Sequence, residues 1–134
     1  MAYVTHATTS GGRDGRAVLE DDKLALAMAL PRDMGGSGAG HNPEQLFALG
    51  WSSCFGQAIL ALARKHDLDG QRAKVTVAVS IDKDETSFAL SAKITVALPG
   101  ADPEKLRALA DDAHGICPYS KATRGNIAVT VDIA

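Results

Sequence analysis

The chain has 134 residues, of which 46% are apolar and 22% charged, with a formal net charge of -2. This balance is typical of a globular protein and predicts a single domain over residues 1–134. The near-neutral charge and the 4% share of aromatic residues argue against nucleic acid or an anionic membrane as a partner.

The amino-terminal segment is expected to form three short strands. Residues 1–10 have neither the basic nor the apolar region of a secretory signal, which favours a cytoplasmic location. Turns are expected at 11–15 and at Asp21-Asp22, because glycine and aspartate tolerate the backbone angles of turns. The runs of β-branched and apolar residues predict strands over 3–9, 16–20 and 23–30.

A long helix is predicted from Pro43 to about Lys65. Asn42 suits the N-cap and Pro43 the first helical position. Gln45 stands at the third helical position, where a capping box has Glu or Gln. Apolar residues lie on almost all sides of this helix, so we expect it to be buried. The longest apolar run, 58–63, is too short to cross a bilayer, and no membrane span is expected.

The carboxyl-terminal half predicts a hairpin, a second helix and a last strand. Apolar residues alternate with period two in the hairpin, and Asp102-Pro103 repeats the N-cap and proline pattern, with Gly115 as the expected stop. The expected elements are strands over 73–81 and 86–98, a helix over 103–114 and a strand over 127–133. The order βββ–α–ββ–α–β predicts an α+β fold with largely antiparallel sheet around the long buried helix.

Two cysteines, Cys54 and Cys117, raise the main chemical question. In a reducing cytosol they are inert packing residues, metal ligands or a redox pair. Gly50 and Gly56 flank Cys54 in the predicted helix, where each glycine costs roughly 1 kcal/mol relative to alanine. They indicate either tight helix packing or space for a substrate beside the sulfur. Cys117 precedes Pro118 and should be extended, just past the second helix.

The charged candidates each have two interpretations. Arg13, in the glycine-rich turn, is a solvated loop residue or a cation beside a thiol, where it would lower the thiol pKa and favour the nucleophilic thiolate. Glu44 is an acid in the first helical turn or the bidentate partner that orients an arginine. Zinc binding by His114, Cys117 and Cys54 is disfavoured, because no second close pair of ligands is present.

Three segments in their order resemble the organic hydroperoxide resistance proteins, in the superfamily shared with the osmotically inducible protein C (OsmC/Ohr). They are GGRDG at 11–15, NPEQLFA at 42–48 leading to Cys54, and CPYSKATRGNI at 117–127. The resemblance covers about residues 5–133 and implies an OsmC/Ohr-like fold in an intertwined homodimer. Trp51 stands where tyrosine is frequent, and His41 where a small polar residue is usual. Both differences affect the expected pocket rim and substrate range rather than the chemistry.

The resemblance implies a thiol-dependent peroxidase that reduces alkyl and fatty-acid hydroperoxides to alcohols. By this resemblance Cys54 is the peroxidatic cysteine, which becomes a sulfenic acid, and Cys117 is the resolving cysteine, which forms a disulfide with it. Arg13 is implied to stabilise the thiolate, and Glu44 to orient Arg13. No metal or bound cofactor is implied, and the implied reductant is a dihydrolipoyl group on a lipoylated protein.

The spacing of Glu44 and Cys54 limits how one site can hold both. Ten residues of continuous helix span about 15 Å along the axis. Either the helix breaks near Gly50, or Glu44 is supplied by the other subunit. Because the resemblance implies an intertwined homodimer with its sites at the subunit interface, we predict that each site combines residues from two chains.

Other functions remain open at this stage. The osmotically inducible sister branch would keep the fold and use a broader range of peroxides, although the form of residues 117–126 favours the hydroperoxide resistance branch. A non-enzymatic redox sensor would need a recognition element such as a basic helix, which the sequence lacks. Two inert core thiols would predict slow alkylation and no peroxide consumption.

Overall fold

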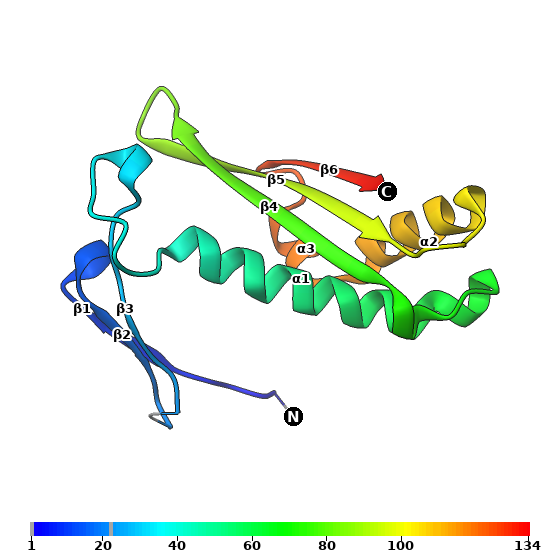
Figure 1. Ribbon diagram of the computed structural model, residues 1–134, viewed down its shortest axis with the longest axis horizontal. Helices are drawn as coiled ribbons and strands as arrows, with labels where there is room; N and C mark the ends of the chain where they lie inside the picture. Colours follow the sequence, from blue (N-terminus) through cyan, green and yellow to red (C-terminus); the bar gives the residue numbers. More distant parts are fainter. Residues whose placement is uncertain (1, 22) are drawn as a thin grey trace. The chain divides into compact units, whose positions relative to one another are not determined.

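The structure is a computed structural model that describes residues 2–21 and 23–134 (Figure 1). The chain divides into two compact units, Met1–Leu46 and Phe47–Ala134. Each unit contains one three-stranded sheet, with strand order β1-β2-β3 in the first and β4-β5-β6 in the second. The expectation of one domain over residues 1–134 stays a prediction.

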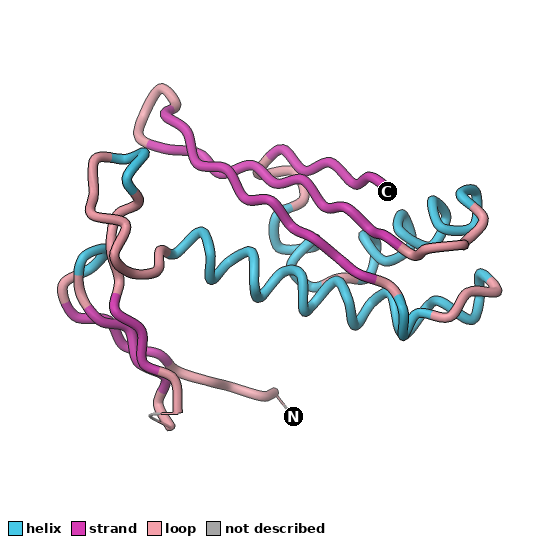
Figure 2. The backbone as a smooth tube through the Cα atoms, viewed as in Figure 1, coloured by secondary structure: helices cyan, strands magenta, loops and turns pink. Residues whose placement is uncertain are grey.

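The first unit is an antiparallel meander of short strands (Figure 2). Its strands are β1 (Ala7–Ser10), β2 (Arg16–Leu19) and β3 (Ala25–Ala27). All three were expected, but β3 begins later than position 23, because the amide of Leu19 donates to the carbonyl of Leu24 and closes a turn there. Part of the turn expected at Asp21-Asp22 lies outside the described residues, since Asp22 is not among them.

The first unit has little hydrophobic core of its own. Among its described residues only Met28 and Ala29 are buried, whereas Tyr3 and Val4 are 88% and 65% exposed. A small sheet needs a covered apolar face or a packed helix to be stable in water. This unit therefore leaves apolar surface that a folded chain normally covers.

Helix α1 (Pro43–Leu62) continues from the first unit into the second without a break and is followed by a 3₁₀ turn, η3 (Ala63–His66). The predicted helix end at about Lys65 falls within that turn. The predicted burial on all sides is wrong for a single chain: Trp51 and Phe55 are fully buried, whereas Leu49 is 65% exposed. Only one side of the helix has the core of this chain to pack against.

The second unit completes the α+β fold. It contains the hairpin β4 (Lys74–Lys83) and β5 (Phe88–Ala97), the helices α2 (Pro103–Ile116) and α3 (Pro118–Thr123), and the last strand β6 (Ala128–Ile133). Strand β6 pairs parallel with β5, whereas the other strand pairs are antiparallel. A parallel neighbour requires a long crossover, and α2 with α3 provides it (Figure 1).

The core of the second unit lies between one face of its sheet and the helices. Residues of β4 and β5 alternate between this core and solvent, as the period-two pattern predicted. The buried apolar residues form one cluster that includes Trp51, Phe55, Ala58, Ile59, Val77, Ala92, Ile94, Val96, Leu106, Leu109, Ala110, Ala113 and Cys117. By length and composition alone, Pro43–His66 could cross a bilayer, a property that core helices of globular proteins share.

The end of α2 differs from the prediction. The helix passes through Gly115 to Ile116, and Cys117 then takes an extended conformation before Pro118. Proline therefore ends the helix and glycine does not, because Pro118 disfavours helical angles at the residue before it. The short helix α3 that follows was not predicted, since six residues carry no apolar period, although proline suits its first position.

Candidate functional site

The two cysteines, distant in sequence, lie side by side in the second unit. The Sγ atoms of Cys54 and Cys117 are 3.6 Å apart, and both thiols are free. Cys54 is partly exposed on α1, whereas Cys117 is completely buried at the junction of α2 and α3. At this separation a short approach of the sulfurs would form a disulfide, whose S–S bond is about 2 Å long.

The local sequence explains why Cys117 faces α1. Its backbone is extended, with φ -63° and ψ 123°, as the following proline requires. The Cys117 amide still donates to the carbonyl of Ala113, and its own carbonyl accepts from the amide of Lys121. Cys117 is thus fixed at both ends, between the last turn of α2 and the first turn of α3.

The surroundings of Cys54 within the second unit disfavour its thiolate. Burial raises the pKa of the Cys54 thiol, and the adjacent Cys117 side chain raises this pKa further. The main-chain amide of Tyr119 acts in the opposite direction and lowers the Cys54 pKa by hydrogen bonding to the sulfur. A cysteine nucleophile at neutral pH would therefore need a further positive charge beside this sulfur.

In the first unit, a glycine turn positions Arg13. The turn contains the 3₁₀ helix η1 (Gly12–Asp14), preceded by Gly11 at φ 78°. Gly15 has no room for a side chain, because a Cβ there would overlap the carbonyl oxygen of Ser10. Asp14 Oδ1 accepts a hydrogen bond from the amide of Leu30 and ties the turn to the chain beyond β3.

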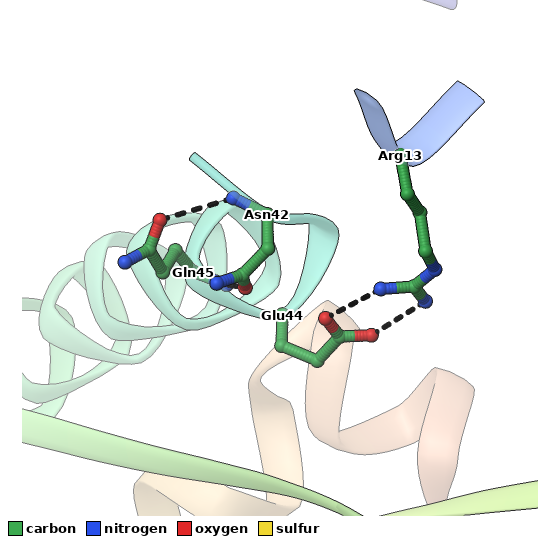
Figure 3. A network of polar contacts seen from close by, with 4 residues as sticks. All are labelled: Arg13, Asn42, Glu44 and Gln45. Atoms are coloured by element: carbon green, nitrogen blue, oxygen red, sulfur yellow. Dashed lines mark hydrogen bonds and ion pairs between the residues drawn. The ribbon is translucent and has the colours of Figure 1, made fainter. Parts of the chain in front are cut away.

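Arg13 and Glu44 form a bidentate ion pair (Figure 3). Arg13 Nη1 donates to Glu44 Oε2 at 2.9 Å, and Nη2 donates to Oε1 at 2.8 Å. The Glu44 side chain is 13% exposed and that of Arg13 39% exposed. The hydrogen bonds to Arg13 lower the pKa of Glu44, and the same bonds raise the pKa of Arg13. Both groups are charged at neutral pH, and the pair holds the guanidinium in one orientation.

Glu44 is positioned by the start of α1. The main-chain amide of Gln45 donates to Asn42 Oδ1 at 2.9 Å, and the main-chain amide of Asn42 donates to Gln45 Oε1 at 3.0 Å (Figure 3). This reciprocal pair is the predicted capping box, and it satisfies backbone donors that the first helical turn leaves free. The start of α1 is therefore fixed, and with it the position from which Glu44 reaches Arg13.

The four predicted site residues thus occur as two close pairs. Cys54 and Cys117 pair in the second unit, and Arg13 and Glu44 pair in the first. Because α1 runs unbroken through Gly50, the alternative in which this helix breaks there is wrong. The grouping of both pairs in one site, and the role of each residue, stay predictions.

Several contacts beside the thiols were not recognised from sequence. Buried Trp51 donates from Nε1 to Ser120 Oγ at 3.4 Å, and the Tyr119 ring lies against Gly50. The GxxxCxG-like spacing around Cys54 drew attention to Gly50, and the structure supports the helix-packing interpretation there. Nothing in the second unit lies close to Gly56, so a Cβ there would meet open space.

A hydrogen bond joins Arg124 to the last turn of α2. Exposed Arg124 donates from Nη2 to the His114 carbonyl at 2.6 Å and satisfies an acceptor there. Burial, followed by the charge of Arg124, lowers the pKa of His114. Within residues 2–21 and 23–134, no three His, Cys, Asp or Glu side chains are grouped to hold a metal ion.

Comparison with known proteins gives a consistent family. Residues 35–132 match the family model described as OsmC-like protein. The chain is 44% identical over its whole length to an organic hydroperoxide resistance protein of Xanthomonas axonopodis pv. citri, 96% of which is covered.

Solved structures agree. A Vibrio cholerae protein described as an organic hydroperoxide resistance protein, with captopril in one of its active sites, is 43% identical, with TM-score 0.91 over 99% of this chain and 92% of that one. A Legionella pneumophila organic hydroperoxide resistance protein is 36% identical, with TM-score 0.92 over 100% of this chain and 98% of that one. The chain therefore belongs to the OsmC-like family, in its organic hydroperoxide resistance branch.

Proposed function

We propose that this protein is a thiol-dependent peroxidase that reduces organic hydroperoxides to alcohols. The observation that carries the proposal is the 3.6 Å separation of the Cys54 and Cys117 sulfurs. Cys54, the more exposed of the two, attacks the peroxide, and buried Cys117 then reacts with the Cys54 sulfenic acid to form a disulfide. The relatives named as organic hydroperoxide resistance proteins support organic hydroperoxides as the substrate class. Within that class, the proposed substrates are alkyl and fatty-acid hydroperoxides.

The proposed cycle has three balanced steps. The Cys54 thiolate attacks the outer oxygen of the hydroperoxide, the O–O bond breaks, and the alkoxide leaves as an alcohol after taking a proton. Cys54 is then a sulfenic acid, and the Cys117 thiol displaces its hydroxyl as water to form the disulfide. A dihydrolipoyl dithiol on a lipoylated protein reduces this disulfide to two thiols and becomes a cyclic disulfide itself.

In this proposal Arg13 supplies the positive charge that the Cys54 environment lacks. Burial holds the Cys54 pKa above its ordinary value, so the thiolate needs a nearby cation. Since the Arg13–Glu44 pair forms within one chain, the two residues would act together. With α1 unbroken between Glu44 and Cys54, we propose that this ion pair stabilises the Cys54 thiolate of the partner subunit.

Two surfaces support a homodimer. Helix α1 exposes Leu49 and Leu60, which are 65% and 40% exposed on an otherwise apolar helix. The described part of the first unit buries only Met28 and Ala29. A second copy that covered these surfaces would give both units the apolar burial that folded chains require. We propose that the dimer functions in the cytoplasm, where lipoylated proteins and reduced thiols occur together.

Mixed dimers test the two-chain site directly. Arg13→Ala and Cys54→Ser chains carrying different affinity tags are co-expressed, and the hybrid dimer is purified by both tags. If Arg13 acts across subunits, one site in the hybrid keeps Cys54 of one chain and Arg13 of the other, and about half of the normal activity returns. An inactive hybrid would mean that both residues act within one chain.

The substrate and the reductant are tested with the purified full chain. Consumption of tert-butyl or linoleic hydroperoxide is measured with dihydrolipoamide and dihydrolipoamide dehydrogenase, and with thioredoxin and glutathione systems in parallel. We expect the dihydrolipoyl system to sustain turnover best. A clear preference for hydrogen peroxide would instead contradict the proposed substrate class.

A further inference from the structure

One side of α1 carries the peroxide-reactive cysteine and a set of packing residues. Phe47, Gly50, Trp51 and Cys54 follow the spacing of one helix face. Against this face lies the segment from Cys117 to Ser120, which contains the second thiol. The packing between face and segment therefore bears directly on the separation of the two sulfurs.

Gly50 forms the seat of the Tyr119 ring. A Cβ at Gly50 would lie 2.9 Å from Tyr119 Oη and 3.2 Å from a ring carbon, closer than such contacts normally occur. The ring of Phe47 flanks both Tyr119 and Trp51, with centroid separations of 6.1 and 5.2 Å. The absence of a side chain at Gly50 thus lets the segment that holds Cys117 approach α1.

The second contact is a buried hydrogen bond. Trp51 Nε1 donates to Ser120 Oγ at 3.4 Å, and both residues are completely shielded from solvent. A buried donor left without a partner is destabilising, so this bond favours the arrangement in which Ser120 stays opposite Trp51. Ser120 is three residues after Cys117 and in the first turn of α3.

We propose that Gly50, Trp51 and Ser120 are positioning residues that hold the Cys117–Ser120 segment against α1 and thereby set the approach of the two sulfurs. The inference rests on the proposed role of Cys54 and Cys117 as a redox pair. Positioning raises the effective concentration of one thiol at the other, so it favours the disulfide over mixed disulfides and over further oxidation.

The first test measures the stability of the disulfide without peroxide. Full-length protein is equilibrated in buffers of reduced and oxidised glutathione, where two protein thiols and one oxidised glutathione give the disulfide and two reduced glutathione molecules. We expect Trp51→Phe and Ser120→Ala each to lower the equilibrium constant about threefold to tenfold, the range of one net hydrogen bond. The double variant should lose little more than either single variant, since all three lack the same bond.

A glycine pair provides the matched control. Gly50→Ala should displace the Tyr119 ring and lower the same equilibrium constant, whereas Gly115→Ala, in helix α2, adds a Cβ that meets no atom within 4 Å. Circular dichroism checks that every variant is folded. Trp51 is the single tryptophan of the chain, so its fluorescence reports disulfide formation in the forms that keep it.

The outcomes separate this inference from the proposed function. Equilibrium constants unchanged in folded Gly50→Ala, Trp51→Phe and Ser120→Ala, beside a normal wild-type disulfide, would overturn the inference alone. A wild-type chain that forms no Cys54–Cys117 disulfide in this buffer would overturn the inference and the proposed function together. Lower constants in these variants, with Gly115→Ala unchanged, would support positioning even in a protein without peroxide turnover.

Discussion

The two units of this chain differ in how they hold their close pair of polar side chains. In the second unit, Cys54 and Cys117 are held by a hydrophobic core that includes Cys117 itself. In the first, Arg13 and Glu44 are held by a glycine turn and a helix cap, with hardly any buried apolar residue nearby. The thiols thus depend on side-chain packing and the charges on backbone hydrogen bonds.

This difference suits the different needs of the two groups. Partial burial raises the pKa of the Cys54 thiol. A guanidinium remains charged near the surface, and a bidentate carboxylate is enough to orient it. Such separate supports are what the proposed action of the Arg13–Glu44 pair on the thiols of another chain requires.

The two cysteines should respond differently to removal. We expect Cys54→Ser to abolish hydroperoxide turnover, because the attacking sulfur is lost. Cys117→Ser should reduce one equivalent of peroxide and leave Cys54 as a sulfenic acid, which a second equivalent of peroxide then oxidises to sulfinic acid, since no thiol is left to resolve it. Stopped-flow peroxide consumption and intact-protein mass spectrometry measure both effects. Sustained turnover by Cys54→Ser would show that Cys54 is not the nucleophile.

Loss of Arg13 should slow the chemistry without unfolding the second unit. We expect Arg13→Ala to reduce the rate constant for hydroperoxide about a hundredfold, the loss typical of a removed charge-stabilising group. The pH midpoint of Cys54 alkylation should rise in the same variant, because the thiolate loses its cation. Iodoacetamide kinetics between pH 5 and pH 10 give this midpoint. Equal midpoints in the wild type and the variant would contradict an effect of Arg13 on the pKa of the Cys54 thiol.

Core truncation should affect the two units unequally. Leu109 is fully buried in α2, and Leu109→Ala should lower the free energy of unfolding by about 2–5 kcal/mol. Leu26 is half-buried in β3, and within one chain Leu26→Ala should lower the free energy of unfolding by less than about 1 kcal/mol. Urea unfolding at several protein concentrations compares them. If a second copy covers Leu26, the loss will exceed this value at concentrations where the dimer forms and will shrink toward it as the protein is diluted.

The smallest effect concerns acid pH. Pairing with Arg13 lowers the Glu44 pKa in the folded chain, so its stabilising contribution is present above the ordinary value of 4.5 and is lost as the pH falls further. The exposure of Arg13 keeps this contribution small. Unfolding midpoints between pH 3 and pH 6 should therefore fall more steeply for the wild type than for Glu44→Gln. Parallel curves would contradict a contribution from the pair.

Much of the fold could be predicted because it depends on local pattern. The alternation in β4 and β5, the cap of α1 and the proline after Cys117 are properties of a few neighbouring residues. The predictions failed where a more distant or weaker signal decided. Helix α3 is too short for a period, and α2 passes Gly115 and ends only where Pro118 makes Cys117 extended.

The site was predictable to a similar degree. The motifs identified the residues, and the resemblance supplied their pairing, but neither indicated that Tyr119 needs the empty space at Gly50. Nor did they indicate the bond between Trp51 and Ser120, since these residues are distant in the chain and each is ordinary where it stands. Contacts of this kind depend on side-chain shapes that meet only after folding.

The sequence by itself determined the types of the elements, the start of α1, the extended backbone at Cys117 and the family, because each depends on short-range sterics or on motifs preserved in order. Tertiary structure alone decided that the sulfurs of Cys54 and Cys117 lie 3.6 Å apart and that Arg13 and Glu44 form a bidentate ion pair. It also decided that burial disfavours the Cys54 thiolate. The physical reason is that distance and solvent exclusion are properties of packing between segments, which no local stretch of sequence contains.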